Sequence, residues 1–175
     1  KAKKELEKCV RIDPFHHKTN SLLAKIYLIE KNWKMSLVKI EQSIKQNSYF
    51  VYQDYVIRAK SYFELKQYEK AISDYNELIN FGSGDITAFH ENRGKSYYNL
   101  SDYKYAEKDY SELISRYDKK SKKRAEAFYM RGNCRYPLNE FKKARSDFSN
   151  AIRIQEKGKY FFSRGTINRA LNKYQ

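Results

Sequence analysis

Arginine recurs at one position of a repeating pattern, directly before a small residue: Arg58, Arg93, Arg131 and Arg164. A row of guanidinium groups could bind phosphate groups, because each presents a planar fork of N–H donors. However, an aspartate follows each of the first three arginines sixteen residues later: Asp74, Asp109 and Asp147. In the first unit both members are absent, with Leu23 and Lys39 at those places. In these four units the arginine and the aspartate are either both present or both absent. This favours an Arg–Asp salt bridge inside each unit that has them over a phosphate site.

Lysine recurs directly after the same small residue in three units: Lys25, Lys60 and Lys95. Three residues further on, four units carry an apolar or aromatic side chain: Leu28, Phe63, Tyr98 and Tyr136. Lysines beside rings suit an extended acidic peptide, because the charges steer and neutralise it while the rings supply buried area. Solvated lysines beside rings that pack inside the protein would give the same pattern. Both interpretations stay open at this point.

Residue patterns typical of catalysis or metal binding are absent from the sequence. It contains no glycine-rich phosphate loop with lysine, no nucleophile elbow and no HExxH motif. His16, His17 and His90 have no nucleophile at a suggestive spacing, and the first two are expected to be exposed in a turn. Cys9 and Cys134 have no Cys or His partners at zinc-ligand spacing. We therefore predict a non-catalytic protein without metal ions or cofactors.

The chain of 175 residues carries a net charge of +15, from 36 Lys and Arg against 21 Asp and Glu. This balance suggests an acidic partner (a nucleic acid, an anionic membrane or an acidic peptide), although lysine could also serve only as the solvating residue. The run Lys119–Arg124 in an expected linker has two corresponding interpretations, a nucleic-acid contact or solvated charge. Without a run of about 18 apolar residues we expect no membrane span. Two distant cysteines are compatible with a reducing compartment, and we expect the cytoplasm.

Internal repeats give the strongest signal. Aligned small residues recur 35, 35, 38 and 33 residues apart, at Ala24, Ala59, Gly94, Gly132 and Gly165. Nine residues after each stands an aromatic: Trp33, Tyr68, Tyr103, Phe141 and Tyr174. A second small residue and then a bulky one follow, as in Ala106 and Tyr110. Small residues let two helices approach closely while large ones fill the space beside them, so each unit is predicted to be a helical hairpin that stacks on its neighbours.

This framework resembles the tetratricopeptide repeat family. The resemblance is clearest in RGKSYYNLSDYKYAEKDYSELI at 93–114 and RAKSYFELKQYEKAISDYNELI at 58–79, and it covers essentially the whole chain. It implies an all-α, right-handed superhelical solenoid of antiparallel helix hairpins. Arg135 and Asn168 replace the tyrosine expected in the last two units, so we expect those hairpins to pack less tightly.

The resemblance also implies how the chain is divided. We expect a single solenoid over 1–175, part of a longer array, with the second helix of a partial repeat at 1–16 and a partial repeat at 158–175. Full repeats are expected at 17–51, 52–86, 87–124 and 125–157. Expected helices lie near 1–12, 18–31, 34–46, 52–65, 68–81, 87–100, 103–116, 124–137, 141–155 and 158–171.

In function, the resemblance implies a protein–protein interaction scaffold whose concave groove binds an extended or helical segment of a protein or peptide. The lysines and the net charge suggest that this segment is acidic. The predicted groove residues are Lys18, Lys25, Lys60, Phe63, Asn92, Lys95, Tyr98, Tyr129, Asn133 and Tyr136. The alternative is a basic helical-repeat module that binds RNA. The lysine–asparagine pairs with which some family members grip a C-terminal carboxylate have no match here, so we do not predict a receptor for chaperone tails.

Three structural expectations follow. Ala59, Gly94 and Gly132 should be buried between helices, because close approach requires small residues there. Lys25, Lys60 and Lys95 should point into one concavity. Near them, Phe63, Tyr98 and Tyr136 should form an exposed aromatic strip.

Overall fold

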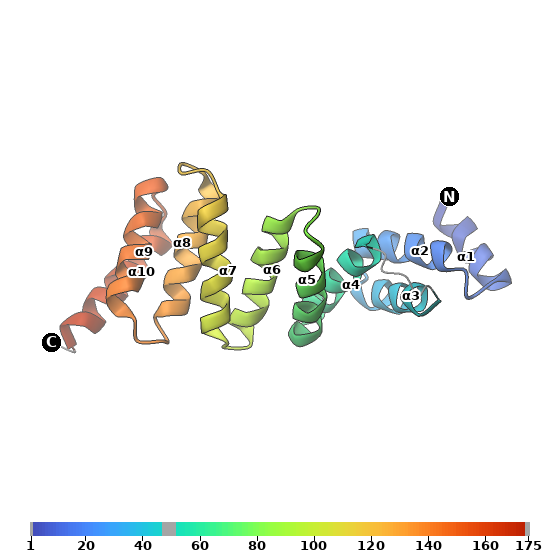
Figure 1. The fold of residues 1–175 in the computed structure, drawn as a ribbon, viewed down its shortest axis with the longest axis horizontal. Coiled ribbons are helices and arrows are strands. Elements are labelled where there is room, and N and C mark those ends of the chain that lie inside the picture. Colours follow the sequence, from blue (N-terminus) through green and yellow to red (C-terminus); the bar gives the residue numbers. More distant parts are fainter. Residues whose placement is uncertain (1, 47–51, 174–175) are drawn as a thin grey trace. The chain divides into compact units, whose positions relative to one another are not determined.

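The structure, a computed structural model, describes residues 2–46 and 52–173. Ten α-helices account for all the regular secondary structure of these residues, and no strand occurs among them. Figure 1 labels the helices in chain order. The prediction of an all-α fold is confirmed.

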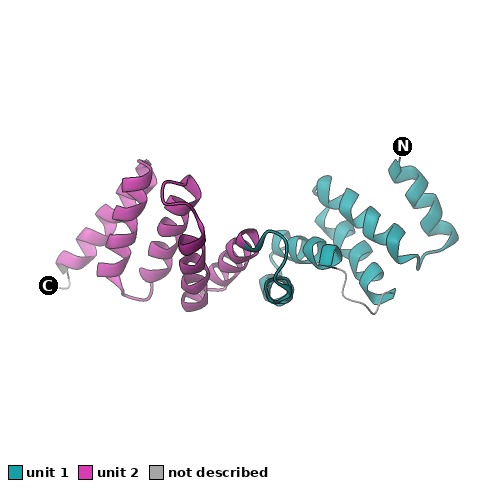
Figure 2. Ribbon diagram, turned by 45° about the horizontal axis from the view of Figure 1, so that its top comes forward, with its two compact units in different colours: residues 1–86 teal, residues 87–175 magenta. Residues whose placement is uncertain are grey.

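The chain forms two compact units, residues 1–86 and residues 87–175 (Figure 2). The first contains α1 (Ala2–Ile12), α2 (His17–Ile29), α3 (Trp33–Gln46), α4 (Tyr52–Glu64) and α5 (Tyr68–Phe81). The remaining helices are α6 (Ile86–Asn99), α7 (Tyr103–Arg116), α8 (Lys122–Arg135), α9 (Phe141–Ile154) and α10 (Gly158–Lys173). Every helix end lies within two residues of its expected position. The periodic pattern therefore located the helices correctly.

Within each unit, helices that follow one another in the chain pack side by side. In the first unit, α1 packs on α2, α2 on α3, α3 on α4 and α4 on α5. In the second, α7 packs on α8, α8 on α9 and α9 on α10. A core cluster of the second unit includes Tyr110, Leu113, Phe128, Cys134 and Tyr160, which come from α7, α8 and α10. Each hairpin thus buries its apolar face against the next one, as expected for stacked repeats.

Small residues allow the two helices of one hairpin to approach closely. Ala59 is fully buried, and Gly94 and Gly132 are also buried, as predicted. A Cβ atom at Gly132 would lie 2.6 Å from Cε1 of Phe148. A Cβ atom at Gly94 would lie 3.4 Å from Cζ of Tyr110. The bulky residue sixteen positions after each glycine therefore fills the space beside it.

Four hairpins share one backbone conformation in the turn between their helices. A residue other than glycine adopts a positive φ there: Lys31 (58°), Lys66 (59°), Ser101 (62°) and Asn139 (59°). The N–H of Ser101 donates to the carbonyl of Tyr98 (3.0 Å), and the N–H of Asp102 donates to the carbonyl of Tyr97 (2.8 Å). These two bonds satisfy carbonyls at the end of α6, which is the Schellman type of helix cap. The constant turn explains why the offsets inside each unit do not vary.

Helix α8 begins two residues earlier than expected. The Oγ atom of Ser121 accepts a hydrogen bond from the N–H of Lys123 (3.2 Å) and caps the helix. Lys122 and Arg124 consequently belong to the first turn of α8. The prediction that the whole run Lys119–Arg124 is a linker was wrong in its second half, because the capping serine inside the basic run was overlooked.

Candidate functional site

Each arginine of three hairpins binds the aspartate of its own hairpin through two hydrogen bonds. In Arg58, Nε donates to Oδ2 of Asp74 (2.9 Å) and Nη2 donates to Oδ1 (2.6 Å). The same two distances are 2.9 and 2.6 Å between Arg93 and Asp109, and 3.0 and 2.7 Å in the third pair, Arg131–Asp147. All three aspartates are buried. The predicted salt bridges are confirmed, so these three arginines serve the fold.

Two further residues join these ion pairs, and sequence reasoning missed both. Nδ1 of His90 lies 2.7 Å from Oδ1 of Asp109. Arg135 donates from Nη1 to Oδ2 of Asp147 (2.7 Å) and from Nε to Oε1 of Glu107 (2.8 Å). Arg135 therefore bridges α7 and α9 at the place where a tyrosine was expected. Its position four residues after Arg131 was the signal that could have revealed a second cation at Asp147.

The lysines of the predicted groove have different surroundings in the two units. Lys18, Lys25 and Lys60 are exposed in the first unit. Lys25 also lines an apolar hollow of about 480 Å³ between α1 and α2. In the second unit, Nζ of Lys95 lies 2.5 Å from Oε1 of Glu91, one helical turn earlier in α6. That the lysines of both units line one groove stays a prediction.

The predicted groove aromatics pack across the turn inside their own hairpins. Phe63 meets Tyr68 with ring centroids 5.9 Å apart, and Tyr98 meets Tyr103 at 5.5 Å. Tyr136 contacts the ring at position 141 at 5.7 Å. Phe63 and Tyr98 are half-buried, whereas Tyr136 is 45% exposed. The expected exposed strip therefore holds at Tyr136, whereas Phe63 and Tyr98 are only half-exposed, and in each hairpin the aromatic five residues later covers one side of the ring.

The remaining groove candidates are half-buried: Asn92, Tyr129 and Asn133. The ring of Tyr129 lies 5.1 Å from that of Tyr160 and 5.9 Å from that of Phe148. Nζ of Lys159 lies 4.4 Å from the centroid of Tyr129. These contacts cover part of the Tyr129 ring. A role of Tyr129 in ligand binding stays a prediction.

An apolar pocket lies between α6, α7 and α8 and has a volume of about 240 Å³. We call it the α6–α8 slot. Its uncharged lining consists of Tyr110, Leu113, Tyr117, Ala127 and Met130. Its charged lining consists of Glu91, Lys95, Lys123 and Glu126. Lys95 is thus a predicted groove residue that lines a pocket of the second unit, as Lys25 lines a hollow of the first.

Tyr110 is the most buried residue with a polar group in this lining. It is 1% exposed, and its hydroxyl has no hydrogen-bond partner among the residues that the structure describes. Burial raises the pKa of this phenol, so it stays protonated and able to donate a hydrogen bond. The sequence identified Tyr110 as a bulky packing residue but could not indicate that its hydroxyl would be unpaired.

The carboxylate of Glu126 is neutralised from outside the slot. Nζ of Lys159 lies 2.5 Å from its Oε1, and the hydroxyl of Tyr160 donates to its Oε2 (2.8 Å). Burial would raise the pKa of Glu126, but the hydrogen bonds from Lys159 and Tyr160 outweigh it and lower the pKa. Over the described part of the chain, Lys123 forms no ion pair, and its Nζ lies 5.9 Å from the ring of Tyr117. The border of the slot therefore carries two lysines and two glutamates, and both glutamates are paired with lysines.

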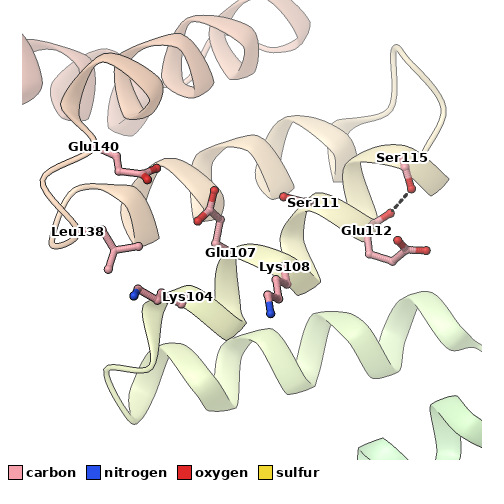
Figure 3. A pocket seen from close by; sticks show the side chains of 8 residues that line it. All are labelled: Lys104, Glu107, Lys108, Ser111, Glu112, Ser115, Leu138 and Glu140. Atoms are coloured by element: carbon pink, nitrogen blue, oxygen red, sulfur yellow. Dashed lines mark hydrogen bonds between the residues drawn. The ribbon is translucent and has the colours of Figure 1, made fainter.

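A second hollow, of about 640 Å³, lies between α7 and the turn that leads into α9 (Figure 3). Lys104 and Lys108 contribute positive charge to it, and Glu107, Glu112 and Glu140 contribute negative charge. Since both signs are mixed along its wall, this hollow favours neither an acidic nor a basic ligand.

Residues 2–46 and 52–173 contain no group of three or more His, Cys, Asp or Glu that could hold a metal ion. No helix in these residues is both long and apolar enough to cross a membrane.

Residues 55–80 and residues 125–157 each match the tetratricopeptide repeat family. No curated protein matches the sequence. The family matches fall in both compact units, one in each.

Several solved structures share the fold. One is residues 41 to the end of MamA from Desulfovibrio magneticus RS-1, with a TM-score of 0.76 at 13% identity over 89% of this chain and 85% of that chain. Another is YrrB, described as a TPR protein with an unusual peptide-binding site, with a TM-score of 0.75 at 13% identity over 95% of this chain and 84% of that chain. A third is the C-terminal part of a TPR repeat-containing protein from Cytophaga hutchinsonii, at 0.76 and 16% identity over 98% of this chain and 66% of that chain. Proteins built from such repeats typically mediate protein–protein interactions. The repeat pattern, the hairpin fold and the two family matches together make this chain a tetratricopeptide repeat protein.

Proposed function

We propose that this chain is a non-catalytic scaffold that binds an acidic segment of a partner protein. The observation that carries the proposal is the α6–α8 slot, an apolar pocket between the first helices of two successive repeats. At its border both glutamates are paired with lysines, and Lys123 has no acidic partner in the described residues. Apolar walls supply buried contact area, and the surrounding cations attract carboxylates. The peptide-binding site described for YrrB, which shares the fold, supports a peptide segment as the ligand.

The predicted lysines provide the test of this function. The test is a triple variant that combines Lys25→Glu, Lys60→Glu and Lys95→Glu, and its ligand is an acidic peptide selected from a display library. We expect the variant to associate with this peptide more slowly than the original protein, by about tenfold or more. Its dependence on salt should also decrease. Surface plasmon resonance at several salt concentrations measures both quantities, and circular dichroism checks that the fold is intact.

A matched control reverses three exposed lysines on second helices: Lys34, Lys45 and Lys142. Both triple variants change the net charge equally, so only a local effect separates them. Equal association rates for the two variants would contradict a role of these first-helix lysines in binding an acidic segment.

Nucleic-acid binding is the second candidate function, and one hollow favours it. This hollow, of about 640 Å³, is lined by four cations: Lys119, Lys120, Arg124 and Arg153. No carboxylate lines it, and in the described residues none of the four forms an ion pair. However, the ring of Phe128 at this place is 8% exposed and lies beneath Arg124 at 5.7 Å, so it offers no free face for base stacking.

Salt dependence distinguishes the two functions. Binding of a labelled single-stranded RNA through these four cations should weaken steeply with salt, with a slope of about 0.7 per phosphate neutralised. Reversal of Lys119 and Lys120 to Glu should then reduce RNA affinity. If RNA binds weakly and the reversal has no effect, the acidic-segment function alone is retained.

A further inference from the structure

The hollow with four cations lies where the turn between α7 and α8 meets α8 and the end of α9, and we call it the basic hollow. Lys119 and Lys120 come from the turn, Arg124 from the first turn of α8 and Arg153 from the last turn of α9. Its lining holds no carboxylate, and its remaining members are Phe128 and Ile154. A lining with one sign of charge selects a negatively charged ligand.

Carboxylates near these cations in the chain do not neutralise them. Oδ1 of Asp118 accepts the backbone N–H of Lys120 (2.9 Å) inside the turn. Glu126 is held by Lys159, and Glu156 is exposed beyond the end of α9. None of the three lines the hollow or forms an ion pair with its cations in the part of the chain that the structure describes. The hollow therefore keeps its positive charge.

The guanidinium group of Arg124 is held in place without a ligand. Its Nη1 donates to the carbonyl of Tyr117 (3.2 Å), and its Cζ lies 5.7 Å from the centroid of Phe128. Nη2 of Arg153 donates to an uncharged amide, at Oδ1 of Asn150 (3.2 Å). Since these partners are uncharged, both arginines keep their charge and further N–H donors. Planar guanidinium groups of this kind match the oxygen atoms of a phosphate group.

The number of cations and the buried ring indicate which anion fits. A carboxylate carries one negative charge, whereas a phosphorylated side chain carries about −1.5 to −2 and three acceptor oxygens at pH 7. Four cations without ion pairs therefore favour the phosphate monoester. RNA carries one charge per phosphate along an extended chain and gains affinity from bases that stack on exposed rings. Phe128 is 8% exposed, so the hollow lacks such a ring.

The size of the hollow suggests what carries the phosphate. Its volume of about 640 Å³ lies within the roughly 300–1,000 Å³ of pockets that hold drug-sized ligands. This space accommodates a phosphate group together with the residues on either side of it. A segment of a partner protein supplies both.

We propose that the basic hollow binds a phosphorylated side chain of a partner segment, with Arg124 and Arg153 binding the phosphate oxygens and Lys119 and Lys120 adding attraction. The inference rests on the proposed function in one respect, that the ligand is a segment of a partner protein. It adds a second site of the same unit and makes binding depend on phosphorylation of the partner.

The test uses fluorescein-labelled peptides of glycine and alanine that differ only at one central residue: phosphoserine, serine or glutamate. Their uncharged flanks separate the phosphate from the acidic-segment function. In fluorescence anisotropy with the whole 175-residue chain, the phosphoserine peptide should bind about tenfold or more tightly than the serine peptide. The glutamate peptide should fall between them, because it offers one charge and two oxygens.

A matched pair of variants separates the hollow from the general charge of the protein. Arg124→Gln combined with Arg153→Gln removes two charges from the hollow. Arg11→Gln combined with Arg169→Gln removes two exposed arginines of α1 and α10 and is the control. The hollow variant should bind the phosphoserine peptide about tenfold more weakly than the control does, while the serine peptide binds equally to both.

Two exposed lysines of the turn provide a second comparison. Circular dichroism checks folding, and if the hollow variant does not fold, Lys119→Gln combined with Lys120→Gln decides the outcome. Its control combines Lys34→Gln with Lys45→Gln, which are exposed lysines outside the hollow. The lysine variant should again bind the phosphoserine peptide more weakly than its control does.

Two further probes identify the source of the phosphate. Inorganic phosphate should displace the phosphoserine peptide only far above the Kd of the peptide; displacement near that Kd would mean that the free ion is the ligand and would overturn binding of a segment. A labelled oligouridylate should bind equally to the hollow variant and to its control. If the oligouridylate responds to the hollow variant and the phosphoserine peptide does not, the hollow is a nucleic-acid site and the proposal is overturned.

The remaining negative outcomes are distinguishable from a failure of the proposed function. Equal affinity for the phosphoserine and serine peptides would overturn the phosphate site. Equal weakening in the hollow variant and its control would overturn it too, because diffuse net charge would then explain the binding. Neither result affects acidic-segment binding, which the reversal of the first-helix lysines tests separately.

Discussion

Arg93 and Asp109 face each other across one hairpin through two parallel hydrogen bonds of 2.9 and 2.6 Å, and His90 lies 2.7 Å from the same carboxylate. Asp109 is only 2% exposed. A carboxylate this deeply buried is compensated for lost hydration by its ion pair and hydrogen bonds. The pair therefore ties α6 to α7 at the same place where equivalent pairs tie the other two hairpins.

Neutralising Asp109 should be strongly destabilising. In Asp109→Asn the shape is kept but the charge opposite the buried Arg93 is lost, and we expect the free energy of unfolding to fall by about 3 kcal/mol or more. Urea unfolding followed by circular dichroism measures the change. The control is Glu112→Gln, which removes an exposed carboxylate 2.7 Å from Arg116 and should cost less than about 1 kcal/mol. Similar losses of unfolding free energy in the two variants would show that the buried Arg93–Asp109 pair stabilises the fold no more than an exposed ion pair does.

Two glycines should respond in opposite directions to the same substitution. A Cβ atom at Gly132 would lie 2.6 Å from the ring of Phe148, whereas one at Gly165 has no atom within 4 Å. Gly132→Ala should therefore destabilise by about 1–3 kcal/mol through overpacking. Gly165→Ala should stabilise by about 0.5–1 kcal/mol, because alanine is the better residue inside a helix. Thermal unfolding of both variants checks the prediction, and a shift of the same sign in both would contradict it.

The fold was predictable because each level of the sequence pattern points to the same hairpin. The small residue, the aromatic nine residues later and the bulky residue after it keep fixed offsets, so the helices could be located before any contact was known. The Arg58–Asp74 spacing likewise identified an ion pair from its joint presence and absence. Such signals can be read from one sequence because they recur in several units.

The candidate site was less predictable, because its properties depend on contacts that occur once. Tyr98 and Tyr103 stand five residues apart, but only the geometry of the turn at Ser101 decides that their rings meet. The unpaired hydroxyl of Tyr110 depends on how three helices pack around it. Arg135 departs from the repeat pattern, so the repeat could not indicate its bond to Glu107, although its spacing from Arg131 could have suggested the bond to Asp147.

Glycine should improve the turn at position 101. Ser101 has a φ of 62°, in the left-handed region where a Cβ atom is unfavourable. We expect Ser101→Gly to raise the free energy of unfolding by about 0.5–1 kcal/mol, since relief of this strain exceeds the entropy that glycine adds to the unfolded chain. The exposed 3.3 Å contact between the hydroxyls of Tyr103 and Ser101 is lost at little cost. Ser146→Gly, at an exposed position inside α9, is the control and should destabilise. A loss of stability in Ser101→Gly would count against strain in this turn.

The two cysteines should differ sharply in reactivity. Cys134 is fully buried, and burial raises the pKa of its thiol to about 12, whereas Cys9 is exposed on α1. At pH 8 a thiol with that pKa is ionised to roughly one part in ten thousand, and the thiolate is the reactive form. We expect an aromatic disulfide reagent to modify one thiol per chain rapidly and the second only as the protein unfolds. Cys9→Ser should abolish the rapid phase, and two rapid phases in the original protein would contradict the burial of Cys134.

The same raised pKa predicts a loss of stability at alkaline pH. Because the folded state holds the Cys134 proton more tightly than the unfolded chain, whose thiol has a pKa of about 8.5, this contribution is complete below that pH. It decreases as the pH rises toward the folded pKa of about 12. Replacing the thiol by Cys134→Ala removes the titrating group, so the variant should lose less stability than the original protein between about pH 8 and pH 10. Urea midpoints at these two pH values measure the difference, and parallel losses would mean that Cys134 ionises freely in the folded protein.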